Sequence, residues 1–254
     1  MVVRSAPGES VAFRALRLLD AFDEQHRVLS MSEVARRAGV PVATAHRRLQ
    51  DLVDGRLVAR RPDGRFEVGA RMWHLGQLSR PTALRETALP HLQDLVAFTG
   101  HTAHVAVLDG IGALVVDRIS GSRTLPTRHQ PGGRLELHCT AVGKALLAFA
   151  DEQLVAQALQ MLAPVTPYTI TDPRVMRTQL AEIRRTRLAP SRQEHRVSTT
   201  GLGVPVFSGR HVVAAVGLVA PLDASLRTAV EPLQRCAAAI GAAIVDRERR
   251  LDGD

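Results

Sequence analysis

The sequence predicts an α+β protein with a small helical domain and hairpin, a helical linker, and a larger domain on a largely antiparallel sheet. Three observations support this. Apolar residues recur at helical spacing between capping residues over the first 55 positions. An Asp-Gly pair then separates two short strand-like segments. Further on, paired strand-like segments lie between helical ones, which is typical of α+β domains. The predicted boundaries are 1–70 for the first domain, 71–84 for the linker and 85–254 for the second domain.

The composition is that of a globular protein, with 45% hydrophobic and 23% charged residues in 254. The longest apolar stretch, 212–222, has 11 residues, whereas a membrane-spanning helix needs about 20. The first ten residues lack the apolar core of a signal peptide. Two cysteines, Cys139 and Cys236, make neither a disulfide framework nor a four-cysteine metal site. We therefore expect a cytoplasmic protein with no membrane partner.

The charge is concentrated near the N-terminus. The chain has 33 basic and 25 acidic residues, a net charge of +8, and Lys144 is its one lysine. Residues 36–65 hold eight arginines against three aspartates, a net charge of +5. Such a segment favours a polyanionic partner. Codon bias and a solvated helix face are the alternative explanations.

The first domain begins with three helical segments. Apolar spacing predicts a helix over 11–23. Ser30 and Glu33 have the spacing of a capping box, which opens a second helix that stops at Gly39. Pro41 suits the first turn of a third helix. This helix spans 42–54, ends at Gly55, and has an expected buried face of Ala45, Leu49, Leu52 and Val53.

Two short helices around a turn of about four residues form a helix-turn-helix. The strand-like segments 57–59 and 66–68 follow at once and enclose Asp63-Gly64, a strong hairpin signal. A helix-turn-helix followed by a basic hairpin is a winged helix. The alternative is an ordinary helical subdomain that carries a hairpin.

The remaining segments alternate between helical and strand-like patterns, with Ser79-Arg80-Pro81 as a break. The expected helices are 72–78, 83–99, 141–150, 151–162, 173–186 and 223–250. The expected strands are near 101–108, 112–119, 123–128, 202–207 and 211–220.

Several of these segments resemble one family, the IclR-type bacterial transcription regulators. The runs 15–22, 40–49 and 66–69 resemble its DNA-binding domain, and 138–148 and 193–207 are similar to the signature blocks of its effector domain. The resemblance covers nearly the whole chain in the expected order. It departs from the family pattern at Val42-Ala43, where a Lys-Ser pair is common, at Arg187, where Gly is usual, and at Gly201, where Cys or Ala is usual.

A winged helix reads DNA through the N-terminal side chains of its recognition helix in the major groove. Arg47 and Arg48 are candidates for a bidentate contact with guanine, worth ~1–3 kcal/mol of discrimination. The wing arginines reach phosphates or the minor groove; their alternative is a set of solvated hairpin charges. The expected contacts with double-stranded DNA are Ser32, Val42, Ala43, Thr44, His46, Arg47, Arg48, Arg60, Arg61 and Arg65.

The resemblance implies that the second domain is a GAF-like α/β sensor, which holds a small-molecule effector between its sheet and loops. The residues that match the family's pocket are Ala141, Val142, Gly143, Ser191, Arg192, Glu194, Gly201, Gly217 and Val219.

The residue types in this pocket favour an organic acid. Arg192 is the candidate partner of a carboxylate, with a surface arginine as the alternative. The amides at Gly143 and Lys144 either hold an anionic ligand or belong to ordinary helix packing with a solvated lysine. Gly217 and Val219 make the pocket apolar, which favours an aromatic or medium-chain acid over glyoxylate.

The resemblance further implies a homodimer or homotetramer on a pseudo-palindromic operator, acting more often as a repressor than as an activator. The linker over 71–84 would transmit the effector's signal.

Two other functions compete with this one. An enzyme is disfavoured: His101 and His104 diverge on a strand, as do His138 and Cys139, and Cys139 fits a small buried residue better. We therefore expect no catalytic residue, metal site or cofactor. The second alternative is a winged-helix module that binds protein without sequence-specific DNA binding.

Overall fold

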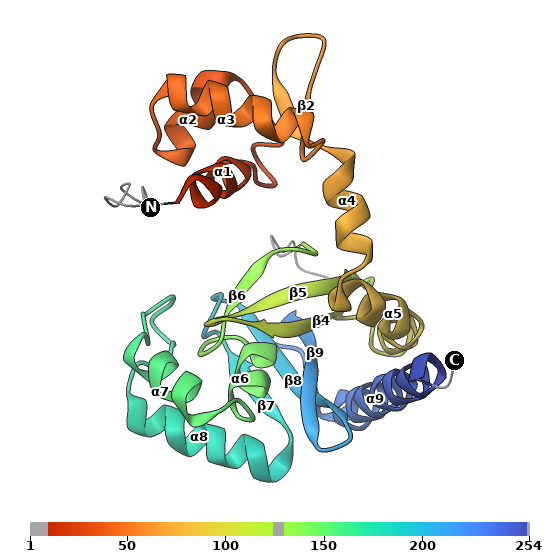
Figure 1. The fold of residues 1–254 in the computed structure, drawn as a ribbon. Helices are drawn as coiled ribbons and strands as arrows, with labels where there is room; N and C mark the ends of the chain where they lie inside the picture. Colours follow the sequence, from red (N-terminus) through yellow and green to blue (C-terminus); the bar gives the residue numbers. More distant parts are fainter. Residues whose placement is uncertain (1–9, 124–129, 253–254) are drawn as a thin grey trace. The chain divides into compact units, whose positions relative to one another are not determined.

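The computed structural model describes residues 10–123 and 130–252, and the chain divides into two compact units, Met1–Ser79 and Arg80–Asp254 (Figure 1). The division falls inside the segment predicted as a linker. The strand expected near 123–128 lies almost wholly outside the described residues.

The N-terminal unit is a winged helix-turn-helix, as the sequence predicts. Its elements are α1 (Val11–Leu19), β1 (Val28–Leu29), α2 (Met31–Ala38), α3 (Val42–Asp54), β2 (Val58–Arg60), β3 (Phe66–Val68) and α4 (Ala70–Gln77). The strands form an antiparallel sheet in the order β1-β3-β2. One core joins α1, α2 and α3 to the sheet, and it includes Leu18, Leu29, Val34, Leu49, Leu52 and Phe66.

The first helix is shorter than expected, ending at Leu19 rather than at residue 23. The Asp23 carboxylate accepts hydrogen bonds from the amides of Gln25 and His26 at 2.9 and 2.8 Å. Such a side-chain turn competes with helix continuation. It turns the chain toward β1, a strand that the sequence did not predict.

The wing forms as predicted around Asp63-Gly64. The Arg61 amide donates to the Arg65 carbonyl at 2.8 Å, and Gly64 has a φ of +81°, a conformation that favours glycine. β1 adds a third strand by pairing Leu29 with Phe66.

The helix α4 differs from the others because it has no buried residue. Met72, Trp73, Leu75 and Leu78 are all exposed, Trp73 by 70%. The break predicted at Ser79-Arg80-Pro81 is confirmed only at Ser79, because the next helix already starts at Arg80, three residues earlier than expected.

The second unit is an α+β domain. Its elements are α5 (Arg80–Thr99), β4 (Thr102–Asp109), β5 (Gly112–Ile119), β6 (Arg134–Glu136), α6 (Ala141–Leu147), α7 (Glu152–Gln160), α8 (Pro173–Thr186), β7 (Ala189–Arg192), β8 (Thr199–Ser208), β9 (His211–Pro221), a 3₁₀ turn (Arg227–Ala229) and α9 (Val230–Asp252). The six strands are antiparallel in the order β6-β5-β4-β9-β8-β7.

Helices cover both faces of this sheet (Figure 1). The long helices α5 and α9 pack on one face around Leu92, Leu218, Leu233 and Ile240. The shorter α6 and α8 close a second core on the other face, around residues such as Leu147 and Met176. The predicted effector residues on the strands, Arg192 excepted, lie on the side that α6 covers.

Two helix boundaries of this unit differ from the prediction by three residues or more, besides the early start of α5. α6 ends at Leu147, and α9 begins at Val230 rather than at residue 223. The delay arises because the Leu222 amide donates to the Ser198 carbonyl and the Ala224 amide to the Pro221 carbonyl, both at 3.0 Å. Over residues 10–123 and 130–252, no helix has the length and apolar character needed to cross a membrane.

Candidate DNA interface and effector site

The helix-turn-helix is held by local interactions that the sequence encodes. The Ser30 hydroxyl accepts from the Glu33 amide at 3.3 Å, and the Glu33 carboxylate accepts from the Ser30 amide at 2.7 Å. This capping box fixes the start of α2. Gly39, with a φ of +65°, ends α2 and turns the chain. Pro41 precedes α3 at its N-cap position, one residue before the predicted first turn.

The third helix presents one face to its core and the other to solvent. Ala45, Leu49 and Leu52 are buried, as expected. The predicted DNA contacts lie on the other side: Val42, Ala43, His46 and Arg47 are exposed, and Thr44 and Arg48 are half-buried. Ser32 is exposed in the first turn of α2. The fold therefore leaves the proposed reading surface of α3 open.

The structure gives different surroundings to Arg47 and Arg48, the two arginines that the sequence could not distinguish. Arg48 donates to the Asp51 carboxylate at 2.9 Å, and its side chain is only 16% exposed. Arg47 is exposed and makes no hydrogen bond or ion pair with any described residue. A guanidinium without a protein partner keeps all its donors for a base edge.

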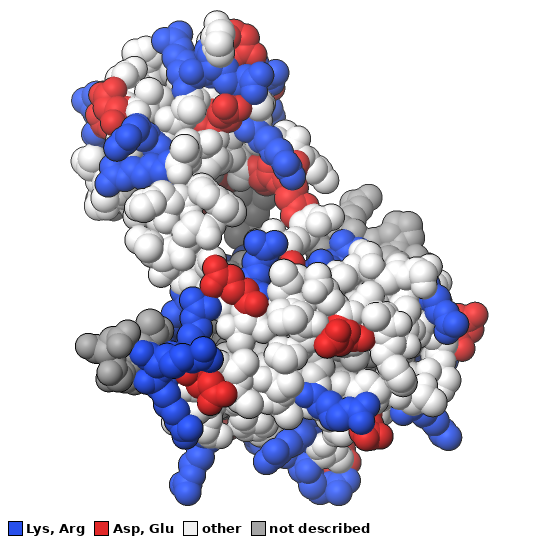
Figure 2. Space-filling model, turned by 90° about the vertical axis from the view of Figure 1, so that its right-hand side faces the viewer, with Lys and Arg blue, Asp and Glu red and all other residues white. Residues whose placement is uncertain are grey.

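The wing arginines are exposed, yet each already has a partner. Arg61 donates to the Glu67 carboxylate at 2.9 Å, and Arg65 donates to the Val28 carbonyl at 3.0 Å. The Arg60 guanidinium lies 6.0 Å from the centre of the Phe66 ring. Basic and acidic side chains are accordingly mixed over this unit in Figure 2. Because these contacts are exposed, phosphate can replace the carboxylates at little cost.

Four of the predicted effector residues come together on one face of the sheet through its strand register. Ser191 of β7 pairs with Gly201 of β8, and Gly201 pairs with Val219 of β9. Gly217 lies two residues before Val219 and therefore on the same face. Residues from three strands thus share one surface, although up to 28 positions separate them in the sequence.

The N-terminal turn of α6 packs directly on this surface. A Cβ at Gly203 would lie 2.5 Å from the Ala141 carbonyl oxygen, and a Cβ at Gly217 would lie 2.7 Å from Val142 Cγ1. The missing side chains therefore allow the close approach. Gly143 is buried, and its amide donates to the Thr140 hydroxyl at 3.1 Å. Helix packing accounts for Gly143.

Lys144 is the largest departure from the sequence-based expectation, which allowed it to be solvated. Its side chain is 0% exposed, and Nζ donates to Glu194 Oε1 at 2.6 Å. Burial lowers the pKa of Lys144, and the Glu194 carboxylate opposes this by favouring the charged form. The other carboxylate oxygen, Glu194 Oε2, is buried without a hydrogen-bond partner among the described residues. The pair ties α6 to the loop after β7.

Two neighbouring candidates of the effector site point different ways. Ser191 is buried, and its hydroxyl donates to the Cys139 carbonyl at 2.8 Å. Arg192 is exposed at the end of β7, because successive side chains of a strand face opposite sides. The structure therefore brings Ser191, but not Arg192, to the α6 side of the sheet.

The residues considered for catalysis do not form a reactive set. His104 lies within β4 and His101 before it, while His138 Nε2 is 2.9 Å from the Ala163 carbonyl oxygen. The buried Cys139 thiol lies 3.6 Å from His195 Nδ1, a contact that the sequence did not predict. Burial raises the pKa of Cys139 to about 12, which keeps the thiol protonated and weakly nucleophilic.

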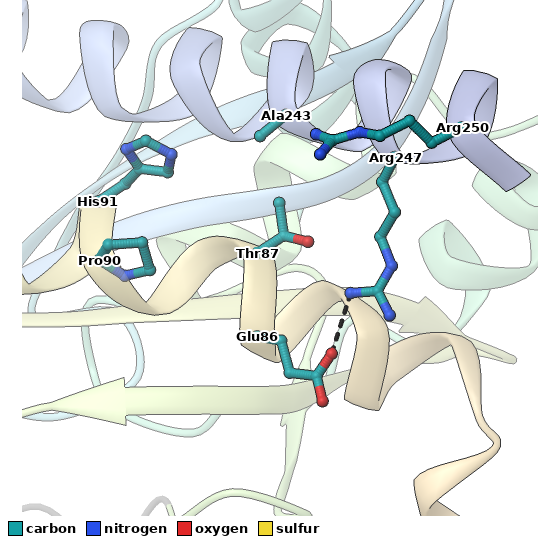
Figure 3. A pocket seen from close by; sticks show the side chains of 7 residues that line it. All are labelled: Glu86, Thr87, Pro90, His91, Ala243, Arg247 and Arg250. Carbon is teal, nitrogen blue, oxygen red and sulfur yellow. Dashed lines mark hydrogen bonds and ion pairs between the residues drawn. The ribbon is translucent and has the colours of Figure 1, made fainter.

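Two cavities lie away from the predicted effector residues. One, of about 430 Å³, runs between α5 and α9 and is shown in Figure 3, where Arg247 reaches Glu86 across the gap at 2.9 Å. The other, of about 500 Å³, lies in the N-terminal unit beside Phe22 and Val68. Neither includes a predicted effector residue.

Comparison with protein families matches both parts of the chain. Residues 11–62 match the IclR helix-turn-helix domain, and residues 77–244 match the bacterial transcriptional regulator IclR C-terminal domain. The second match alone covers more than half of the chain.

Individual relatives agree with this assignment. A regulator named SauR from Cupriavidus necator is 32% identical over 222 residues, covering 84% of this chain and 86% of that protein. The transcriptional repressor IclR of Escherichia coli is 27% identical over 217 residues, covering 83% and 79%. The crystal structure of an IclR homologue from Microbacterium hydrocarbonoxydans complexed with 4-hydroxybenzoate matches with a TM-score of 0.88 and 30% identity, covering 92% of this chain and 98% of that one.

The fold and the matches lead to one assignment. The fold consists of a winged helix with an open recognition face and an α+β domain with a glycine-lined face. This family consists of DNA-binding transcriptional regulators with a ligand-binding C-terminal domain, not of enzymes. The chain belongs to the IclR family of bacterial transcriptional regulators.

Proposed function

We propose that this protein is a ligand-responsive repressor that binds a pseudo-palindromic operator at the nucleoid as a homodimer or homotetramer. The observation that carries the proposal is the open face of α3, where Arg47 has no protein partner among the described residues. Two relatives support repression: the repressor IclR of Escherichia coli and the acetate operon repressor of Salmonella typhimurium, 28% identical over 188 residues.

In the proposed complex, α3 lies in the major groove. Arg47 makes the bidentate contact with guanine, while Arg48, held by Asp51, contacts the backbone. The methyl group of Thr44 and the side chains of Val42 and Ala43 offer apolar contacts to thymine. The wing arginines Arg60, Arg61 and Arg65 exchange their present partners for phosphates, and Ser32 and His46 complete the phosphate contacts.

A second copy of the chain is the expected partner of the exposed apolar residues in α4 and at its C-terminal end. Trp73 and Leu78 are 70% and 74% exposed, and burying them between two chains removes apolar surface from water. Two winged helices would then read half-sites about one helical turn, or a multiple of it, apart. Leu78→Ser is expected to weaken self-association in analytical ultracentrifugation and operator binding together.

The proposed effector is an aromatic carboxylic acid. The structural relative in complex with 4-hydroxybenzoate supports this class. So does the apolar character of the face formed by Ala141, Val142, Gly201, Gly217 and Val219. Gly143, Ser191 and Glu194 border this face. Arg192 lies on the opposite side of β7 and is therefore not the proposed partner of the carboxylate.

Effector binding acts by favouring one arrangement of the dimer over another. The two arrangements would place the winged helices at different spacings, so that one fits the operator. The segment 71–84, which comprises most of α4 and the start of α5, joins the two units and would carry the change.

The test is selection of bound fragments from genomic DNA at about 0.15 M salt with excess competitor. A pseudo-palindrome should emerge. Arg47→Ala should lose about 1–3 kcal/mol of discrimination at one base pair of each half-site. Arg177→Ala, at an exposed arginine of α8, is the matched control and should change nothing.

The alternative, a protein-interaction module, makes a different prediction. Binding that depends on salt but not on sequence would refute the regulator and support that module. Calorimetry with 4-hydroxybenzoate and glyoxylate tests the effector class separately, and heat from glyoxylate alone would refute an aromatic acid.

A further inference from the structure

Three potential metal ligands from segments far apart in the sequence converge in the second unit, close to the start of α6. Glu136 is the last residue of β6, Cys139 lies between β6 and α6, and His195 lies in the loop between β7 and β8. His195 Nδ1 is 3.6 Å from Cys139 Sγ and 3.2 Å from Glu136 Oε2. All three ligand atoms lie within 4.8 Å of one another. We propose that these residues bind a divalent cation of the zinc class.

The two separations from His195 Nδ1 are those of a tetrahedral centre, and the thiol and the carboxylate lie within 4.8 Å of each other. With Zn–S near 2.3 Å and Zn–N or Zn–O near 2.0 Å, tetrahedral angles place the sulfur and nitrogen ligands about 3.6 Å apart and the nitrogen and oxygen ligands about 3.3 Å apart. The observed separations are 3.6 and 3.2 Å. Moreover, one nitrogen, Nδ1, faces both the thiol and the carboxylate. A cation among the three atoms satisfies both contacts at once, whereas a single N–H hydrogen does not.

The donor set selects the type of ion. One thiolate, one imidazole and one carboxylate suit zinc, whereas calcium and magnesium prefer oxygen ligands alone. Cys139 and Glu136 together supply two negative charges once the thiol is deprotonated. Lys144, whose charge favours the Cys139 thiolate, is already paired with Glu194.

The site is accessible and has a structural consequence. The side chains of Glu136 and His195 are 50% and 23% exposed, so an ion can enter from solvent, while the buried Cys139 anchors it. Three protein ligands leave a fourth position for water or an anionic ligand. The bound ion would join the β6–α6 segment to the β7–β8 loop. These two segments carry the proposed effector residues Ala141 and Glu194, but the metal site does not depend on the regulator function.

The chain offers a sharp test because it has two cysteines. The full-length protein, freed of metal with a chelator, is titrated with Co²⁺. We expect one equivalent to bind, with a thiolate-to-cobalt charge-transfer band and the intense visible absorption of tetrahedral cobalt, and Zn²⁺ to displace it. Cys139→Ser should abolish the charge-transfer band. Cys236→Ser, which removes the other buried thiol, should leave it unchanged.

The remaining ligands are tested by variants that keep both thiols. His195→Gln and Glu136→Gln should each weaken Co²⁺ binding about tenfold or more. Loss of a residue that binds the metal directly reduces affinity more than loss of a residue that only hydrogen-bonds to such a ligand. Glu152→Gln, at an exposed carboxylate of α7, should bind like the parent protein. Circular dichroism checks that each variant is folded. Absence of the charge-transfer band in the parent protein, or its persistence in Cys139→Ser, would overturn the proposal.

Discussion

The buried ion pair between Lys144 and Glu194 allows a quantitative test of how α6 is held. Lys144 is 0% exposed, and Nζ lies 2.6 Å from the carboxylate. In Lys144→Met, the buried Glu194 loses this partner, while its second oxygen already lacks one among the described residues. Removing one member of a buried pair costs about 3–5 kcal/mol, because the other charge remains without compensation.

The double variant distinguishes this cost from simple loss of packing. Lys144→Met combined with Glu194→Leu replaces both charges by apolar groups of similar size, which is often neutral or stabilising. We therefore expect the double variant to be more stable than either single variant. An exposed pair supplies the control: Arg177 and Glu152 lie 3.0 Å apart, but their side chains are 55% and 70% exposed. Arg177→Met should cost less than about 1 kcal/mol.

Urea unfolding measures these differences. With a slope of about 3 kcal/mol per M, the single variants should shift the midpoint by about 1 to 2 M. The one tryptophan, Trp73, lies in the N-terminal unit. Tryptophan fluorescence therefore does not report on the second unit, and unfolding of that unit in urea is followed by hydrogen exchange of peptides that cover α6. Additive losses in the double variant, or a single variant within 1 kcal/mol of the parent protein, would refute the reasoning.

The pH dependence of Glu194→Leu adds a signed prediction. Burial lowers the pKa of Lys144 below its ordinary 10.5, and this variant removes the opposing carboxylate. The unfolded chain then binds more protons than the folded one between the two pKa values, so stability rises with pH toward about 10.5. A flat profile up to that pH would contradict the proposed burial of the charge.

Three smaller perturbations test the local geometry. Ser30→Ala should cost about 1 kcal/mol by removing the N-cap of α2, measured by Trp73 fluorescence in urea. Hydrogen bonds from Ser30 lower the pKa of Glu33 below its ordinary 4.5. The stability that these bonds contribute is complete above pH 4.5 and is lost as the pH falls below it. Glu33→Gln should therefore flatten the acid limb of the plot of unfolding free energy against pH. Gly203→Ala should destabilise the second unit by about 1–3 kcal/mol, because its Cβ would lie 2.5 Å from a carbonyl oxygen. Gly201→Ala, whose Cβ would have its nearest contact at 3.3 Å, should cost less. Unfolding followed by circular dichroism compares the two variants.

The features that the sequence predicts best are those that neighbouring residues determine. The capping box at Ser30 and Glu33, the turn at Gly39 and the hairpin at Asp63-Gly64 each involve residues at most five positions apart. Their chemistry is complete within one short segment and needs no tertiary contact. The face of α3 follows from helical spacing in the same way.

The features that the sequence did not predict depend on distant partners. The strands β1, β6 and β7 have two to four residues each, too few for a periodic pattern, and they exist because a neighbouring strand pairs with them. The surroundings of Arg47 and Arg48 differ because Asp51 binds Arg48. The cluster at Cys139 and His195 joins residues 56 positions apart, which no local pattern reveals.

The burial of Lys144, in contrast, follows from the residues around it. The helix α6 reads Ala-Val-Gly-Lys-Ala-Leu-Leu, so apolar or small residues occupy every side of it. A helix that is apolar all round is buried, and all seven residues of α6 are. A lysine inside such a helix cannot extend to solvent and must find a carboxylate. The second signature block, Gln193-Glu194-His195, contains one carboxylate. A buried charge needs a partner, and in the structure Glu194 is that partner, which joins the two signature blocks.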